Sequence, residues 1–219
     1  MKGGIFNLKI EIWSDYVCPF CYIGKRRLEE ALKQTGLGEK AEIVFKAYEL
    51  DPNSATESNE SVQVDLAKKY GMSAQEAKNM TDNVVLQAKT VGLNYNFDKM
   101  TSANTFNAHR LAKLAEQEGL DKVVTENLLK AYFIDGEKIG TDDVLLRIAV
   151  EAGLSRDRVK EVLESDEFAE EVKMDIGEAG QLGVKGVPFF VINRKYAISG
   201  AQPVDAFAEA LRQAEEDAV

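Results

Sequence analysis

The 219-residue sequence has only two cysteines, one histidine and four prolines, and it contains no long uninterrupted apolar run. A helix that spans a membrane needs about 20 consecutive, mostly apolar residues, so the sequence predicts no membrane partner. The 27 lysines and arginines are outnumbered by 37 aspartates and glutamates, which gives a formal net charge of −10. Without a basic cluster to neutralise phosphates, this composition argues against a nucleic-acid partner.

The first residues, MKGGIFNLKIEIWSD, have no apolar core of signal-peptide length and no small-residue cleavage site. We therefore expect a cytoplasmic protein. Thiols in that compartment are mostly reduced, so a disulfide there is typical of catalysis rather than of structural bracing. The hydrophobic fraction of 45% is ordinary for a globular protein and sufficient for a core.

Apolar periodicity divides the chain into a β-α-β start, a long helical middle and a β-β-α end. The start forms a βαβ unit with a parallel strand pair. The sequence thus predicts an α/β fold whose sheet domain, residues 1–59 and 182–219, is interrupted by a helical domain, residues 60–181. Strands are expected at 8–13, 41–48, 187–193 and 196–199, and helices at 19–34, 62–70, 73–91, 104–118, 121–133, 142–151, 155–163, 166–182 and 204–214.

Both cysteines lie in one stretch, SDYVCPFCYIGKRRLEEAL, as Cys18 and Cys21. A zinc site needs about four ligands, and the chain adds only His109, some ninety residues away. A structural disulfide across so short a loop would remove little entropy from the unfolded chain. A redox pair fits each position: Cys18 falls at the N-cap of the predicted helix, and Pro19 suits its first turn. A C-x-x-C at the start of a helix in a βαβ unit is the thioredoxin-type context.

In this interpretation Cys18 is the nucleophile, and Cys21, one turn further on, is the resolving thiol. The nucleophilic sulfur must be accessible and readily ionised. Phe20 contributes no charge, so a lowered pKa of Cys18 must come mainly from the N–H groups and dipole at the helix start. We expect a lowered pKa of Cys18, but not the extreme of the strongest oxidants.

A second anchor is Pro188 in GVKGVPFFVIN, at the start of a predicted strand. Proline in that place commonly marks a sheet edge or a bulge. The alternative is a cis Val187–Pro188 bond, which would present the backbone N–H and C=O of Val187 to a peptide or thiol bound beside Cys18.

Four stretches, DYVCPFCYIGKRRLEEAL, NTFNAHRLAKLA, LLKAYFIDGEKIGTDDVL and GVKGVPFFVINRKYAISGAQP, span nearly the whole chain. In that order they resemble the DsbA-like branch of the thioredoxin superfamily, and most closely its cytoplasmic FrnE-type group. That group is related to 2-hydroxychromene-2-carboxylate isomerases and kappa-class glutathione transferases. The resemblance implies a thioredoxin fold interrupted by a helical insertion, a catalytic Cys18/Cys21 pair, and Pro188 as the cis-proline.

The resemblance also implies that Asn104, His109 and Arg110 approach the active-site groove from the helical domain. The local pattern alone favours a different role for His109, as a structural histidine bonded to a backbone carbonyl. It likewise favours Glu11 as a solvent-facing strand residue. In thioredoxin relatives an acid in this strand assists proton transfer at the resolving cysteine, which makes Glu11 a candidate for that base.

The sequence therefore predicts a protein thiol–disulfide oxidoreductase whose substrate docks over Cys18, against Pro19, Phe20 and Val187. It requires no metal or organic cofactor, and its partners are protein thiols and disulfides or glutathione-type thiols. The related isomerases and transferases typically carry serine in place of Cys18, so the cysteine favours disulfide exchange. A glutathione-dependent isomerase or transferase stays open as an alternative, as does a non-catalytic redox-sensing or chaperone module. The two residues between the cysteines are Pro-Phe, whereas in many members of the group this pair looks like Pro-Trp. The direction of electron flow therefore stays open.

Overall fold

The computed structural model describes residues 8–218, which form two compact units. The first unit combines both ends of the chain, Met1–Tyr48 and Asp175–Val219, and the second consists of Glu49–Met174. Among residues 8–218 no helix is both long and apolar enough to cross a membrane.

The first unit contains a four-stranded sheet with the strand order β2-β1-β3-β4. β1 (Leu8–Ser14) and β2 (Ala41–Ala47) are parallel, which confirms the predicted βαβ unit. β3 (Phe189–Ile192) pairs antiparallel with β1, and β4 (Tyr196–Ser199) pairs antiparallel with β3. The β1–β3 pairing joins the two halves of this unit across the whole insertion, and the mixed sheet with its helices confirms the α/β class.

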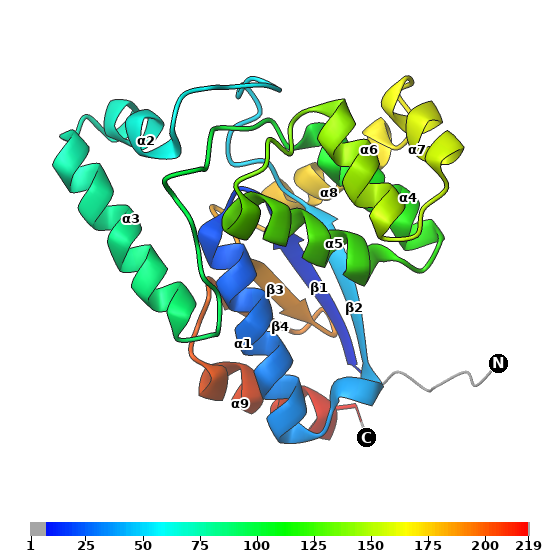
Figure 1. Ribbon diagram of the computed structural model, residues 1–219. Helices are drawn as coiled ribbons and strands as arrows, with labels where there is room; N and C mark the ends of the chain where they lie inside the picture. The colour runs from blue at the N-terminus through cyan, green and yellow to red at the C-terminus, as the bar shows by residue number, and fades with distance from the viewer. Residues whose placement is uncertain (1–7, 219) are drawn as a thin grey trace. The chain divides into compact units, whose positions relative to one another are not determined.

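One face of the sheet packs against α1 (Pro19–Thr35) and α9 (Val204–Glu216). In Figure 1, α1 passes in front of the strands and α9 lies below them. α1 ends at Gly36, whose φ of 70° is the left-handed conformation that closes many helices. Ile23, Leu28, Ala31 and Leu32 of α1 are all buried. The core side chains on this face include Ile10, Ile12, Leu28, Ala31, Leu32, Phe190, Ile192, Phe207 and Leu211.

The opposite face of the sheet packs against the C-terminal part of α8 (Ala169–Gln181) in a smaller cluster around Trp13. The indole N–H of Trp13 donates a hydrogen bond to the backbone oxygen of Asp175, at 2.9 Å. α8 begins three residues later than the predicted residue 166. The reason is Phe168, whose φ of 66° lies outside the right-handed helical region.

The second unit is helical, as the sequence predicts. A capping box is present at Ser73, since the side chains of Ser73 and Glu76 each accept a hydrogen bond from the backbone N–H of the other. The helix predicted to end at Phe133 instead passes into a π-helical turn that stops at Gly136. The helices of the second unit are α2 (Val62–Tyr70), α3 (Ala74–Lys89), α4 (Phe106–Gln117), α5 (Asp121–Lys130), the π turn (Ala131–Asp135), α6 (Asp142–Glu151) and α7 (Arg156–Leu163), followed by the first residues of α8.

Residues 49–59, which the sequence pattern assigned to the sheet domain, belong to the helical unit in the structure. The side-chain amide of Asn104 donates to the Pro52 oxygen at 3.1 Å, and its backbone N–H donates to the Ala55 oxygen at 3.0 Å. A Cβ on Gly140 would stand 2.2 Å from the Thr56 oxygen, so the two backbones pass in close contact there. The polar loop therefore contacts loop residues that are distant in the sequence and precede helices of the second unit, which local composition does not show.

Candidate active site

Cys18 is the N-cap residue of α1, as predicted. Its φ of −88° and ψ of 113° are extended, and Pro19 occupies the first turn of the helix. The backbone N–H of Cys18 donates to the Asp15 oxygen, and that of Cys21 donates to the Cys18 oxygen, both at 3.1 Å. β1 therefore passes into α1 through one tight turn, and the two thiols lie about one helical turn apart. Both cysteines are free thiols.

The Cys18 sulfur lies against the second predicted anchor. The Val187–Pro188 peptide bond is cis, which confirms that prediction. The Cys18 thiol donates to the Val187 carbonyl oxygen at a sulfur–oxygen distance of 3.4 Å. Segments 169 residues apart in the sequence thus meet at the reactive sulfur, within the first unit.

Three contacts that the sequence pattern did not predict position the Pro188 turn and the adjoining residues 200–201. The Gly200 N–H donates to the Pro188 oxygen at 2.8 Å, and Arg27 of α1 bonds the backbone oxygen of Ala201. Gly24 lies beneath the proline ring, where a Cβ would come within 3.0 Å of its Cγ. A helix-interior glycine costs about 1 kcal/mol relative to alanine. The signal that could have revealed this contact is Gly24 itself, in the middle of a strongly helical sequence.

Cys21 lies behind Cys18 and is only 3% exposed. The backbone N–H of Asp15 points at its sulfur, at 3.5 Å. Burial raises the pKa of the Cys21 thiol well above its usual range, and the neighbouring Cys18 raises it further. In the reduced protein Cys21 is therefore a neutral thiol at physiological pH, as suits a group that acts second.

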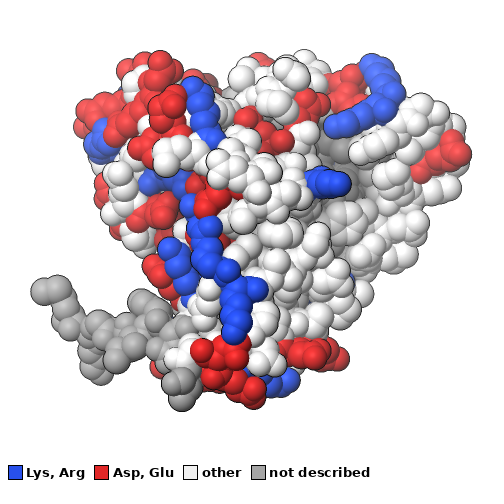
Figure 2. Space-filling model, turned by 180° about the vertical axis from the view of Figure 1, so that it is seen from behind, with Lys and Arg blue, Asp and Glu red and all other residues white. Residues whose placement is uncertain are grey.

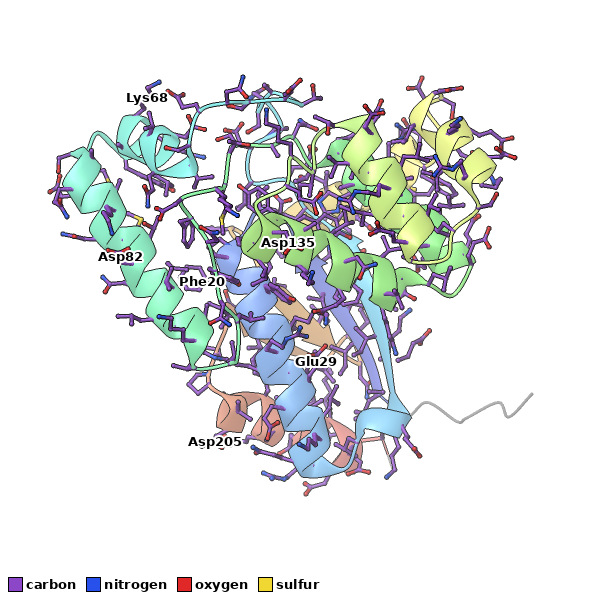
Figure 3. All side chains as sticks on the ribbon, viewed as in Figure 1. Phe20, Glu29, Lys68, Asp82, Asp135 and Asp205 are labelled. Carbon is purple, nitrogen blue, oxygen red and sulfur yellow. The ribbon has the colours of Figure 1, made fainter. Side chains whose placement is uncertain are left out.

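Cys18 is also only 3% exposed, so the prediction of an accessible nucleophilic sulfur is wrong for this dithiol state. One cause of this burial is the Val187 carbonyl oxygen, which contacts the Cys18 sulfur. The next two residues are accessible to solvent: Pro19 is partly exposed, and Phe20, at the first turn of α1 (Figure 3), is 36% exposed. An attacking or attacked substrate must open the thiol–carbonyl contact to reach the sulfur.

Alkylation should separate the two thiols. We expect iodoacetamide to label Cys18 before Cys21 in the reduced, folded protein at mildly alkaline pH, because only thiolates react and Cys21 keeps its proton. Labelling of Cys21 should rise only above the ordinary thiol pKa of about 8.5. Peptide mass spectrometry measures both rates, and protein unfolded in urea, where the two should react alike, is the control. Equal rates in the folded protein would contradict the assigned order.

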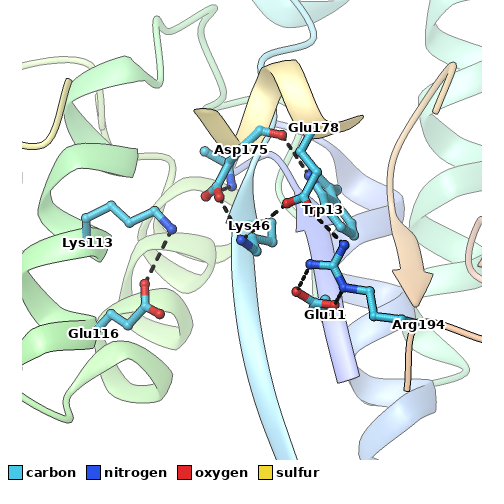
Figure 4. A network of polar contacts seen from close by, with 9 residues as sticks. Glu11, Trp13, Lys46, Lys113, Glu116, Asp175, Glu178 and Arg194 are labelled. Carbon is cyan, nitrogen blue, oxygen red and sulfur yellow. Dashed lines mark hydrogen bonds and ion pairs between the residues drawn. The ribbon is translucent and has the colours of Figure 1, made fainter. Parts of the chain in front are cut away.

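Glu11 lies on the face of the sheet opposite α1. Strand alternation points Ile10 and Ile12 toward α1 and Glu11 toward the other face. There Glu11 is 1% exposed and pairs with Arg194, which also bonds Glu178 at 2.6 Å (Figure 4). The solvent-facing alternative is wrong, since α8 packs on this face and Glu11 is buried there, and proton transfer to Cys21 stays a prediction.

The three predicted residues of the helical unit differ in their contacts. Asn104 accepts from the Phe106 N–H at 3.0 Å and fastens the 49–59 loop. Arg110 is 4% exposed, and its guanidinium donates to the backbone oxygens of Val162, Ser165 and Glu167. Both residues therefore brace their own unit. His109, 4% exposed on α4, is buried as well, and for all three residues substrate binding stays a prediction.

Within residues 8–218, no three histidine, cysteine, aspartate or glutamate side chains come together as a group that could hold a metal ion. The groups with chemistry at this site are the two thiols and the backbone of the Pro188 turn. A thiol at a helix N-cap with a second thiol one turn on can exchange disulfides.

The family model of the DSBA-like thioredoxin domain matches residues 9–212, and the chain belongs to this family. It is 40% identical to a probable DsbA oxidoreductase of Streptomyces coelicolor, over 96% of this chain and 91% of that one, with a TM-score of 0.91. A curated relative, the uncharacterized protein YwbO of Bacillus subtilis (strain 168), is 26% identical over 94% of this chain and 96% of its own length.

Two more distant solved structures share the fold. A 2-hydroxychromene-2-carboxylate isomerase is 15% identical, over 96% of this chain and 98% of its own, with a TM-score of 0.73. The cytosolic disulfide reductase DsbM of Pseudomonas aeruginosa, solved with glutathione, is 14% identical, over 94% of this chain and 98% of its own, with a TM-score of 0.65. The predicted superfamily and thioredoxin fold are confirmed.

Proposed function

We propose that the protein is a thiol–disulfide oxidoreductase in which Cys18 is the nucleophile and Cys21 the resolving thiol. The observation that carries this proposal is the pair of free thiols at the start of α1, with the Cys18 sulfur 3.4 Å from the Val187 carbonyl oxygen. Membership of the DSBA-like thioredoxin family supports it.

The proposed reaction has two exchange steps. The Cys18 thiolate attacks one sulfur of a substrate disulfide, a Cys18–substrate bond forms, and the other substrate sulfur leaves as a thiolate. Cys21 then loses its proton and attacks the Cys18 sulfur, which forms the Cys18–Cys21 disulfide and releases the second substrate sulfur. The substrate gains two electrons that the protein loses, and the reverse sequence oxidises a dithiol. Because the pKa of Cys21 is raised, proton transfer to a departing substrate thiolate would assist the second step.

The substrate in this proposal lies along the Pro188 turn. Once the Cys18–Val187 contact opens, the Val187 carbonyl can accept from a bound peptide, while Pro19 and Phe20 offer apolar surface on the other side of the sulfur. Protein thiols and disulfides or glutathione-type thiols in the cytoplasm are the proposed partners. The glutathione held by a cytosolic reductase of the same fold supports the small-thiol class.

The alternative is a glutathione-dependent isomerase or transferase, which the fold shared with a 2-hydroxychromene-2-carboxylate isomerase supports. Such an enzyme needs one anchoring group at Cys18 and has no use for Cys21. The second thiol, buried directly behind the first, favours disulfide exchange.

Redox titration tests the proposal. The reduced protein is equilibrated with graded ratios of reduced and oxidised glutathione, free thiols are alkylated, and masses are measured. We expect a two-electron conversion to the Cys18–Cys21 disulfide, whereas Cys21→Ser should stop at a mixed disulfide with glutathione. A midpoint near the cytosolic glutathione poise indicates a reductase, and a much more oxidising one indicates a DsbA-like oxidant. Absence of any intramolecular disulfide over the whole range would overturn the proposal.

A further inference from the structure

A groove of about 480 Å³ opens beside the Pro188 turn, entirely within the first unit. It is lined by residues 183–189, which include Val187 and Pro188, and by Ser199 and Gly200. The one charged side chain in this lining is Lys185, and the lining contains no aspartate or glutamate. Since Val187 also contacts the Cys18 sulfur, a substrate held at that sulfur lies next to this groove.

The charge of the groove is opposite to that of the molecule. The chain carries a net charge of −10, and on the face shown in Figure 2 most basic side chains lie beside acidic ones. Two other exposed lysines of this unit follow that rule: Lys40 pairs with Glu215, and Lys195 pairs with Asp217. Lys185 is exposed, and no other residue in the described part of the chain forms an ion pair with it. Its ammonium group is thus available to a ligand.

The reach of Lys185 matches the reacting sulfur. Val187 is two positions further along the chain, and two residues of chain span at most about 7 Å. Its flexible four-carbon stem can therefore place the ammonium beside a group a few bonds from the Cys18 sulfur. The N-terminal end of α1 adds positive potential at the same place.

We propose that this groove selects thiols and disulfides that carry a carboxylate close to the reacting sulfur, with Lys185 as the cation that recognises it. The inference rests on the proposed function and names the substrate class of the same site. An exposed ion pair is modest in strength, so the expected preference is a few-fold rather than absolute.

Three small disulfides of similar size test the selection: anionic dithiodiglycolate, neutral bis(2-hydroxyethyl) disulfide and cationic cystamine. The measured quantity is the rate at which each oxidises the reduced protein at low salt, divided by its rate with the urea-unfolded protein to remove intrinsic reactivity. We expect Lys185→Gln to lower the anionic-to-neutral ratio about two- to fivefold. Lys185→Glu should lower it further and favour cystamine, and high salt should reduce the wild-type preference.

The matched control is Lys195→Gln, which makes the same charge change in the same unit but away from the groove. It should leave the ratio unchanged. A second arm uses disulfide-linked peptides with glutamate or lysine beside the cysteine. A Lys185-dependent preference in this arm identifies peptides as the carboxylate source, and a preference confined to the small disulfides identifies small thiols.

The outcomes separate the two proposals. If none of the disulfides oxidises the wild-type protein to the Cys18–Cys21 disulfide, the proposed function fails. If all of them do so and the normalised ratios are the same for wild type and Lys185→Gln in both arms, the function stands and the charge selection is overturned.

Discussion

Replacing Cys18 by serine should reduce disulfide exchange to the uncatalysed background, whereas replacing Cys21 should stop the reaction halfway. A serine hydroxyl at position 18 cannot form the mixed disulfide. Cys21 cannot substitute for Cys18, because burial raises the pKa of its thiol and keeps it protonated. In Cys21→Ser the first step still occurs, and the Cys18–substrate adduct persists because no second sulfur displaces the substrate.

Reduction of a peptide disulfide, followed together with intact-protein mass, measures both effects. Each variant exchanges one sulfur for one oxygen, so fluorescence of Trp13, the one tryptophan of the chain, serves as a control for correct folding. Full turnover by Cys21→Ser with no accumulated adduct would contradict a resolving role and support the isomerase or transferase alternative. Partner binding that survives in the double serine variant would instead support a chaperone module.

Gly24→Ala should destabilise the protein by about 1–3 kcal/mol and slow exchange, although alanine is the better helix former. The added methyl group would lie 3.0 Å from the Pro188 Cγ and 3.1 Å from the Phe190 Cζ. Neither neighbour can yield freely. Pro188 is held by its bond from Gly200, and Phe190 packs edge-to-face on Phe207 in the core. The strain is therefore expected to move the Pro188 turn away from Cys18.

Gly177→Ala is the matched control, because Gly177 lies inside α8 with no heavy atom within 4 Å of its added Cβ. This variant should gain up to about 1 kcal/mol of stability with unchanged exchange. Urea denaturation gives the free energy of unfolding, and glutathione equilibration gives the Cys18/Cys21 redox midpoint. Pro188 contacts the active site, so Gly24→Ala should shift the midpoint, which a loss of global stability alone would not do. Equal stabilisation by both alanines, with an unchanged midpoint, would show that Gly24 has no positioning role.

The parts of the site that depend on local chemistry could be predicted from the sequence. Cys18 at an N-cap, Pro19 in the first turn and Cys21 one turn later follow from helix geometry alone. The parallel β1–β2 pair follows from strand periodicity around that helix. The cis bond before Pro188 needed the resemblance, because local pattern allowed an edge strand as well.

The remaining features depend on segments that are distant in the sequence. Glu11 has the alternation of an exposed strand residue, yet Arg194 and α8 cover it from more than 150 residues away. The burial of Cys18 likewise depends on a carbonyl 169 residues further along the chain. Glycine is a poor helix former, and the reason for Gly24 in α1 is seen only in the folded structure, where Pro188 packs against it.

The hydrogen bonds of Asp175 have a consequence for how the chain is assembled. Its carboxylate accepts from the Ala47 N–H and from the Lys46 ammonium, both at 3.0 Å (Figure 4). The chain thus leaves the sheet after Ala47 and returns to it at Asp175, and the hydrogen bonds of Lys46 and Ala47 to Asp175 join the two ends of the insertion. The entropy cost of closing a chain segment between two fixed ends changes only slowly with the length of that segment. The helical insertion can therefore diverge, shrink or be exchanged while the strands beneath the two thiols keep their register.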